Sequence, residues 1–387
     1  MSRSTAVPVP ATLFRRPGVR LLFLAPGGAA MLLGLNAALL LLGLPHLPFG
    51  RHLAASHGML LVLGFIGTVI ALERSVALAR PLGYLAPALL GLGGLSLVSP
   101  LPLEVGKTLL LAGSIGMLWV YIPLWRRQRE AAVLIQILGA VSAVAATALW
   151  LRIADTAPLL PLLVVFVVLT IGGERLELAR IHIRSALAEP LLMGISTLLL
   201  AAGLGAVLWA GAGMVLFALA LGAMVVWLLV YDVARHTVRA TGLPRYIAWC
   251  LLVGYGWLAV AAVIFLVAGL GGGTLGGAGY DAGTHAVFLG FTLSMIMAHA
   301  PVILPAVLRR PLPYRPVLIL PAVLLHVSLA LRVFVADVLD DGATRQFAGV
   351  LNIVAVVLFA ALAAGLVISS SRGAPRTPVA RKDPGTA

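Results

Sequence analysis

Long apolar runs fill most of the chain and are separated by short polar segments rich in arginine. A helix needs about 20 largely apolar residues to cross a bilayer, and the pattern predicts about twelve such helices. We expect them at residues 20–43, 56–79, 83–100, 103–125, 130–152, 158–178, 188–208, 211–231, 246–269, 283–308, 315–336 and 346–369. The sequence therefore predicts an all-α fold, a polytopic membrane helix bundle.

The two ends of the chain differ from this pattern. Residues 1–19 are polar and basic, and residues 370–387 are rich in proline, arginine and serine. Such compositions do not bury enough apolar surface to fold, so we expect a disordered leader and a disordered tail. Residues 20–369 then form a single transmembrane domain in contact with the lipid bilayer.

The basic residues test the predicted spans and orient them. Of 27 lysine and arginine residues, 22 fall in the segments that share a side with the N-terminus, and five fall on the other side. Because positive charge is retained on the cytoplasmic side, the sequence predicts that both termini are cytoplasmic. The net charge of +14 thus reflects topology and not a nucleic-acid-binding surface.

Composition limits the chemistry. The chain is 61% hydrophobic and only 10% charged, as expected for an integral membrane protein. Cys250 is the single cysteine, which excludes intramolecular disulfides, iron–sulfur clusters and thiolate zinc sites. Any metal must therefore be held by histidine, carboxylate, methionine or the nitrogens of a cofactor.

Two histidines have similar sequence surroundings and the same predicted depth. His57 lies in SHGMLLVLGF and His285 in THAVFLGF, and each opens an even-numbered span near the predicted outer surface. Parallel helices that present two imidazoles at one depth can clamp a planar ligand, and bis-histidine haem ligation is the commonest example. The alternative for each ring is a packing role with a bond to a nearby carbonyl.

Two further histidines, His299 and His326, lie deeper in the tenth and eleventh spans. His285 and His299 are 14 residues apart, about 21 Å along a helix, so one metal ion does not bind both. His299 and His326 have similar predicted heights near mid-membrane. They are candidates for a second metal site, a proton relay or an interhelical hydrogen bond, with ordinary packing as the alternative.

The segment SHGMLLVLGF resembles the second helix of haem–copper oxidase subunit I, in which the histidine of a His-Gly pair is an axial haem ligand. The partner ligand of that family comes from the tenth helix, here the span with His285 and His299. In span number, orientation and histidine placement over most of the chain, the sequence is more similar to the NnrS family. Those are twelve-span haem- and copper-containing bacterial membrane proteins associated with resistance to nitric oxide and nitrosative stress.

This resemblance implies a haem-binding redox protein of the bacterial inner membrane, with copper as an additional candidate metal and a small gaseous or redox molecule as its ligand. His57 and His285 would hold the haem between spans two and ten. The chain has no His-x-His pair in the tenth span and no adjacent His-His pair. A sensor, scavenger or detoxifying protein is therefore favoured over a respiratory proton pump, and whether it is an enzyme stays open, as does its oligomeric state.

Charged residues near the spans give two more predictions. Arg332 lies toward the outer end of the eleventh span as a candidate partner of haem propionates, or of Asp337 or Asp340. Asp281 is expected to be solvated.

The pairs Glu73-Arg74 and Glu174-Arg175 end spans two and six, which hints at an internal repeat and keeps a secondary transporter as the alternative function. The simpler interpretation is that they anchor helices, although either glutamate could begin a proton or cation path.

Overall fold

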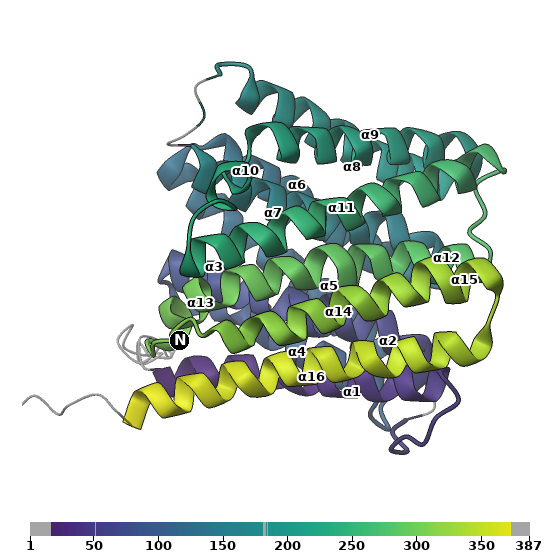
Figure 1. The fold of residues 1–387 in the computed structure, drawn as a ribbon, viewed down its shortest axis with the longest axis horizontal. Helices are drawn as coiled ribbons and strands as arrows, with labels where there is room; N and C mark the ends of the chain where they lie inside the picture. Colours follow the sequence, from purple (N-terminus) through teal and green to yellow (C-terminus); the bar gives the residue numbers. More distant parts are fainter. Residues whose placement is uncertain (1–16, 51, 181–182, 184, 373–387) are drawn as a thin grey trace, which may run out of the picture.

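A computed structural model describes residues 17–50, 52–180, 183 and 185–372, and it is all-α with no strand in these residues (Figure 1). The first half contains α1 (Pro17–Leu41), α2 (Leu53–Met59), η2 (Leu60–Gly67), α3 (Thr68–Leu78), η3 (Pro81–Tyr84), α4 (Leu85–Leu97), α5 (Leu103–Gln128), α6 (Ala131–Trp150), η4 (Ala157–Leu159) and α7 (Leu160–Ala179). The second half contains α8 (Ala188–Leu208), α9 (Ala210–Tyr231), α10 (Ala234–Thr237), α11 (Gly242–Leu270), α12 (Gly277–His285), η5 (Ala286–Leu293), α13 (Ser294–Leu308), η6 (Pro316–Leu318), α14 (Ile319–Leu331), η7 (Arg332–Ala336), α15 (Asp337–Leu339) and α16 (Gly342–Arg372).

The predicted membrane bundle is confirmed. Within the described residues, eleven helices are long and apolar enough to cross a membrane, and the shorter apolar helix Pro81–Leu97 occupies the place of the predicted third span. The predicted number of about twelve therefore exceeds by one the number that meets this length. α1 begins and α16 ends at the left end of Figure 1, as an even number of crossings requires.

The ends of the bundle extend slightly past the predicted boundaries. α1 begins at Pro17 and α16 continues to Arg372, so a few residues assigned to the leader and the tail are helical. The remaining residues of both predicted disordered segments lie outside the described part of the chain.

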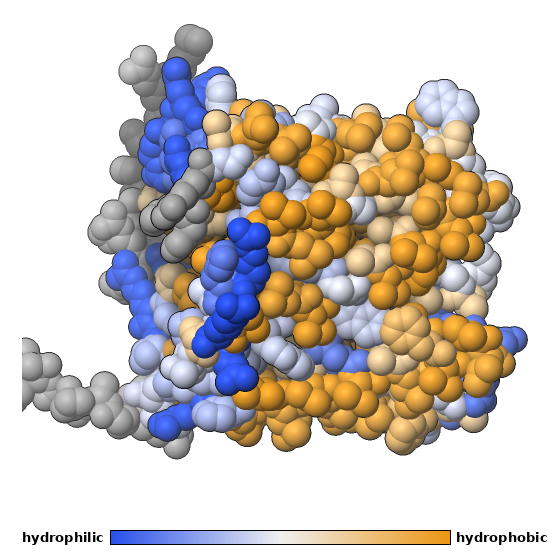
Figure 2. Space-filling view, turned by 45° about the horizontal axis from the view of Figure 1, so that its top comes forward, coloured by the Kyte–Doolittle hydropathy of each residue, from blue (hydrophilic) through white to orange (hydrophobic). Residues whose placement is uncertain are grey.

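The surface of the bundle is largely apolar, as expected for helices in contact with lipid. Figure 2 shows a broad hydrophobic area across the visible face, with hydrophilic residues gathered mainly toward the left end. On α9, the large apolar side chains of Leu219 and Val226 are exposed. Among the candidate spans of the described residues, the one that contains α7 has the largest buried share, and Arg175 near its C-terminal end is buried.

Three π-helical segments interrupt the spans, a feature that the sequence analysis did not predict. η2 begins three residues after His57, η5 begins directly after His285, and η7 begins at Arg332. π-helical turns are rare and occur frequently at functional sites. The two predicted haem ligands and the predicted propionate partner thus all lie at such segments.

Glycines in the two longer π segments allow neighbouring helices to come close. A Cβ on Gly64 would lie 3.2 Å from the Cα of Gly94, and one on Gly290 would lie only 2.4 Å from Cγ of Trp257. These glycines are the middle residues of the two Leu-Gly-Phe sequences that made the segments look alike. The sequence similarity therefore corresponds to a shared local geometry.

The second and tenth spans converge at one end of the bundle. α3 packs against α13, whereas no comparable packing joins α2 to α12 or η2 to η5 within the described residues. Figure 1 shows α3 and α13 together at the left and α2 and α12 further apart at the right. His57 and His285 lie on the diverging portions of these two spans.

Candidate functional site

His57 lies on the last turn of α2, a helix that Figure 1 shows toward the right side of the bundle. Its Nδ1 is 2.9 Å from the carbonyl oxygen of Gly34 on α1. A carbonyl only accepts hydrogen bonds, so Nδ1 carries the proton and Nε2 presents its lone pair. The half-buried ring is close enough to Asp281, His285 and Arg332 to interact electrostatically with them.

His285 is held in the same way from the tenth span. Its Nδ1 lies 2.7 Å from the carbonyl oxygen of Asp281 and 3.2 Å from Oδ1 of that residue, one helical turn earlier. Asp281 also accepts two hydrogen bonds of 2.7 Å each from Nε and Nη2 of Arg332. We refer to His57, Asp281, His285 and Arg332 as the His57–His285 cluster.

His285 and Arg332 thus share Asp281, and His57 lies within electrostatic range of them, while the surroundings of Arg332 differ from the prediction. The guanidinium pairs with Asp281 and not with Asp337 or Asp340, which both bind Arg345 at 3.0 and 3.1 Å. The prediction that Asp281 is solvated was wrong, because α12 turns its carboxylate toward η7.

The Nε2 atoms of the two histidines determine which ligands the His57–His285 cluster can bind. Among the described residues, no hydrogen bond is made to Nε2 of His57 or Nε2 of His285. Metal-binding histidines commonly donate the other ring N–H to a carbonyl or carboxylate, which fixes the tautomer and the ring orientation. Both rings meet this condition, so they fit a metal whose remaining ligands come from a cofactor.

No group of three or more histidine, cysteine, aspartate or glutamate side chains is placed to hold a bare metal ion within the described ranges. Two imidazoles are enough for a metalloporphyrin, because its four pyrrole nitrogens supply the other ligands. The cluster therefore matches the donor set expected for a haem more closely than that of an isolated ion.

His299 lies on α13 in a different environment. Its Nδ1 is 2.7 Å from the carbonyl oxygen of Met295, and its Nε2 accepts a hydrogen bond of 3.1 Å from Nη1 of Arg175 on α7. Arg175 also donates from Nε and Nη2 to the two carboxylate oxygens of Asp232, at 2.5 and 2.9 Å. Both ring nitrogens of His299 are consequently in use.

Asp232 is the centre of this second group, which the sequence analysis did not identify. Besides Arg175, it accepts hydrogen bonds of 2.8 Å from the Tyr255 hydroxyl and 2.7 Å from the Ala234 amide. Arg175, Asp232, Tyr255 and His299 are all buried, and we call them the Arg175 network. A lone acidic residue that ends a long apolar run, in VYDVAR, was the signal available for it in the sequence.

His326 does not join His299. Nε1 of Trp257 donates to its Nδ1 at 3.1 Å, and its Nε2 lies 3.3 Å from the Ser294 hydroxyl. No contact links His326 to His299 among the described residues, so the structure places the predicted second pair in two separate settings. Each ring has partners on both nitrogens, which corresponds to the packing alternative.

The two Glu-Arg sequences meet across the bundle. Nη2 of Arg74 on α3 lies 2.7 Å from Oε1 of Glu73 and 3.2 Å from Oε1 of Glu174 on α7. The Gln136 side chain of α6 accepts a longer hydrogen bond of 3.4 Å from Nη1 of Arg74. These residues form one interhelical cluster, so they do more than anchor the ends of separate helices.

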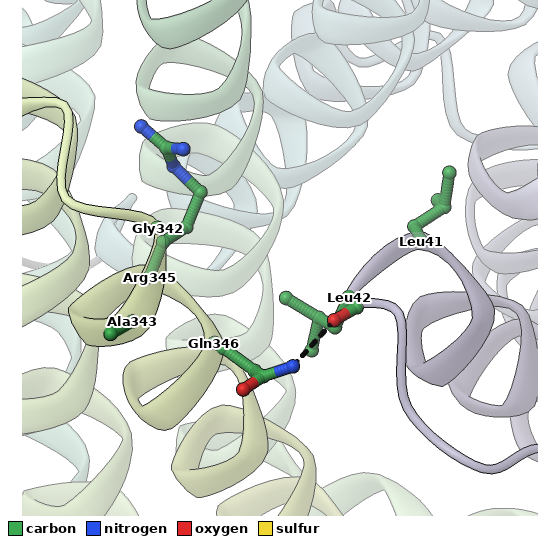
Figure 3. A pocket seen from close by; sticks show the side chains of 6 residues that line it. All are labelled: Leu41, Leu42, Gly342, Ala343, Arg345 and Gln346. Atoms are coloured by element: carbon green, nitrogen blue, oxygen red, sulfur yellow. Dashed lines mark hydrogen bonds between the residues drawn. The ribbon is translucent and has the colours of Figure 1, made fainter.

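A cleft opens beside the His57–His285 cluster. It has a volume of about 370 Å³ and lies between the end of α1 and the start of α16, where Gln346 donates a 2.8 Å hydrogen bond to the Leu42 carbonyl (Figure 3). One turn further along α16, a Cβ on Gly349 would lie 3.4 Å from Nη1 of Arg332. The cleft therefore leads toward the arginine of the cluster.

Comparisons with known proteins identify the family but supply no activity. A family model described as "Domain of unknown function (DUF8744)" matches residues 20–368. No curated protein and no solved structure matches the chain. The matched range covers most of the chain, so the chain belongs to the DUF8744 family of domains of unknown function.

Proposed function

We propose that this protein is a haem-binding redox protein of the bacterial inner membrane, with one haem between the second and tenth spans. Nε2 of His57 and Nε2 of His285 would hold the haem iron. The observation that carries this proposal is that both rings are anchored through Nδ1 while Nε2 has no partner among the described residues.

The chain's own groups would set the properties of the bound haem. The Asp281 carboxylate, beside Nδ1 of His285, would fix the tautomer and the orientation of that ring. Arg332 uses Nε and Nη2 on Asp281, which leaves Nη1 as the donor for a propionate. A haem held by both imidazoles would supply one-electron exchange.

The resemblance to the NnrS family supports nitric oxide or a related small oxidant as the molecule handled, in a response to nitrosative stress. Copper is an additional candidate metal on the same ground. The cleft beside Arg332 offers a small molecule an approach to the cluster.

Absorption spectroscopy tests the proposal. Protein purified in detergent from haem-sufficient cells is expected to show a Soret band, and His57→Ala or His285→Ala should abolish most of it because each removes an axial ligand. His46→Ala is the matched control, since His46 is exposed and contacts only the nearby Leu44 carbonyl. Colourless wild-type protein, or equal haem content in all variants, would contradict the proposal.

A secondary transporter is the second candidate function. The meeting of the two Glu-Arg sequences from different spans favours it, because transporters place buried charges where similar segments face each other. Substrate-dependent uptake into proteoliposomes that is lost in Arg74→Gln would support transport. Full uptake in Arg74→Gln would show that the two Glu-Arg sequences are not needed for transport.

A further inference from the structure

The Glu73 and Glu174 side chains, which we call the carboxylate pair, share one guanidinium inside the bundle. Arg74 contacts both, at 2.7 and 3.2 Å, and the side-chain exposures of Glu73, Glu174 and Arg74 are only 23%, 13% and 12%. The two acids come from spans far apart in sequence, since Arg74 and Glu174 are separated by 100 residues. Tertiary packing has therefore placed two acids and one base in a poorly solvated position.

The charges at this position do not balance. The neighbouring Arg175–Asp232 ion pair is neutral as a unit. His299 accepts a hydrogen bond from Arg175 through Nε2, so its ring is neutral as well. With both acids ionised, the carboxylate pair and Arg74 together carry one uncompensated negative charge, and such a charge is costly where water is scarce.

Three buried polar groups without partners surround the carboxylate pair. The Tyr121 hydroxyl, Nε2 of Gln136 and Nε of Arg74 have no hydrogen-bond partner among the described residues, and the Tyr121 and Gln136 side chains are almost fully buried. The Tyr121 hydroxyl is close enough to interact electrostatically with Arg74, Glu174 and Glu73. Unpaired donors at a buried, polar position are typical of sites that hold water.

We propose that Glu73 and Glu174 bind one exchangeable proton between them, supported by water that bridges Tyr121, Gln136 and Arg74. In the uptake step a hydronium ion transfers its proton to a carboxylate oxygen, which yields a carboxylic acid and a water molecule. A proton removes the uncompensated charge without needing further ligands. A metal cation would lie next to the Arg74 guanidinium and be repelled by it.

The location indicates where the proton comes from and where it can go. The carboxylate pair lies at the end of the bundle that the arginine distribution predicts to be cytoplasmic. Glu73 also interacts electrostatically with His299, which belongs to the Arg175 network. The carboxylate pair is thus an entry point for protons from the cytoplasm toward the interior.

Other ionisable groups also face this position. They are Tyr121 on α5, Arg175 and the exposed Glu177 on α7, and His299 on α13. Arg127 on α5 reaches the backbone of α3 at the Ala77 carbonyl. Only Glu73 and Glu174 combine poor solvation with a shared counter-charge.

Infrared difference spectroscopy tests the proposal on the full-length protein in liposomes. The wild type is expected to show a protonated-carboxyl band that disappears as the pH is raised, equivalent to one proton per chain. Glu73→Gln and Glu174→Gln should each remove this band. Glu177→Gln, an exposed acid on the same helix as Glu174, should leave it unchanged.

Tyr121→Phe gives a second measurement that does not depend on altering the acids. Its hydroxyl has no protein partner, so the variant should fold, and the band should shift in frequency because a bridging water loses one contact. A wild-type spectrum without a protonated-carboxyl band at any pH, or a band that survives in both glutamine variants, would overturn the proposal. This outcome is independent of whether the protein binds haem.

Discussion

The His57–His285 cluster and the Arg175 network contain the same kinds of side chain but leave their histidines in different states. Each is built on an arginine that binds an aspartate through two hydrogen bonds, Arg332 with Asp281 and Arg175 with Asp232. In the His57–His285 cluster, His285 lies beside the Asp281 carboxylate, so its Nδ1 donates a hydrogen bond and its Nε2 stays free. In the second, His299 lies beside the guanidinium, which occupies Nε2.

This difference shows that a histidine beside the carboxylate of an ion pair can bind a ligand, whereas a histidine beside the guanidinium cannot. A carboxylate fixes the tautomer and leaves a lone pair available, whereas a guanidinium donor uses that lone pair. Burial differs as well. The side chains of Arg175 and Asp232 are 3% and 1% exposed, against 10% and 22% for Arg332 and Asp281. We therefore expect the Arg175 network to contribute to stability and the His57–His285 cluster to ligand binding.

Removing the arginine of the Arg175 network should have the largest effect on stability. Arg175→Met leaves the Asp232 carboxylate buried without its counter-charge, which costs about 3–5 kcal/mol in the free energy of unfolding. Denaturant titration of the detergent-solubilised protein measures this change. Haem content, normalised to folded protein, should stay the same because no axial ligand is altered.

The matched control is Arg180→Met on the same segment. Arg180 also binds an acid, Glu130, but its side chain is 55% exposed. Such surface ion pairs contribute about 0–1 kcal/mol. If Arg175→Met were no more destabilising than Arg180→Met, the structural role of the Arg175 network would be refuted.

The aspartate of the His57–His285 cluster should affect binding more than folding. Asp281→Asn keeps the backbone carbonyl that holds His285, but it loses the charged acceptor for both hydrogen bonds from Arg332. Substitution of such supporting residues typically weakens metal binding by about 10–100-fold. Titration of haem into the haem-depleted protein should show this loss.

Asp340→Asn is the control for this experiment. Its side chain is 89% exposed and binds only Arg345 at the same end of the bundle, so haem affinity should not change. Equal affinity in the Asp281 and Asp340 variants would mean that Asp281 does not support the binding of the haem.

Much of the fold was predictable because lipid imposes a simple rule on sequence. Spans must be apolar and about 20 residues long, and their order then fixes which helix ends share a side. The prediction that His57 and His285 lie at one depth followed from that order alone. The helix at Pro81–Leu97 shows the limit of this prediction, because it is apolar but shorter than a membrane span requires.

The partners within each site were not predictable, because they depend on how helices rotate and pack. Asp281 and Arg332 are 51 residues apart and Arg175 and Asp232 are 57 apart, so no local pattern joins them. The π segments after His57 and His285 also change which face of each helix points inward. The alternation of hydrophobic and polar residues does not record such a change, since these spans are apolar on all sides.

Loss of a hydrogen bond to His326 should have the smallest effect on stability, because the partners of His326 are neutral. Trp257→Phe removes the hydrogen bond from Nε1 to Nδ1 of His326 but preserves an aromatic ring against Phe334, so it should cost about 1 kcal/mol in the free energy of unfolding. The same denaturant titration measures it, with Trp209→Phe as the control, since Trp209 is 68% exposed. Haem content should be unchanged in both variants. A loss of haem in Trp257→Phe would mean that His326 also supports ligand binding. It would contradict the conclusion that ligand binding belongs to the His57–His285 cluster alone.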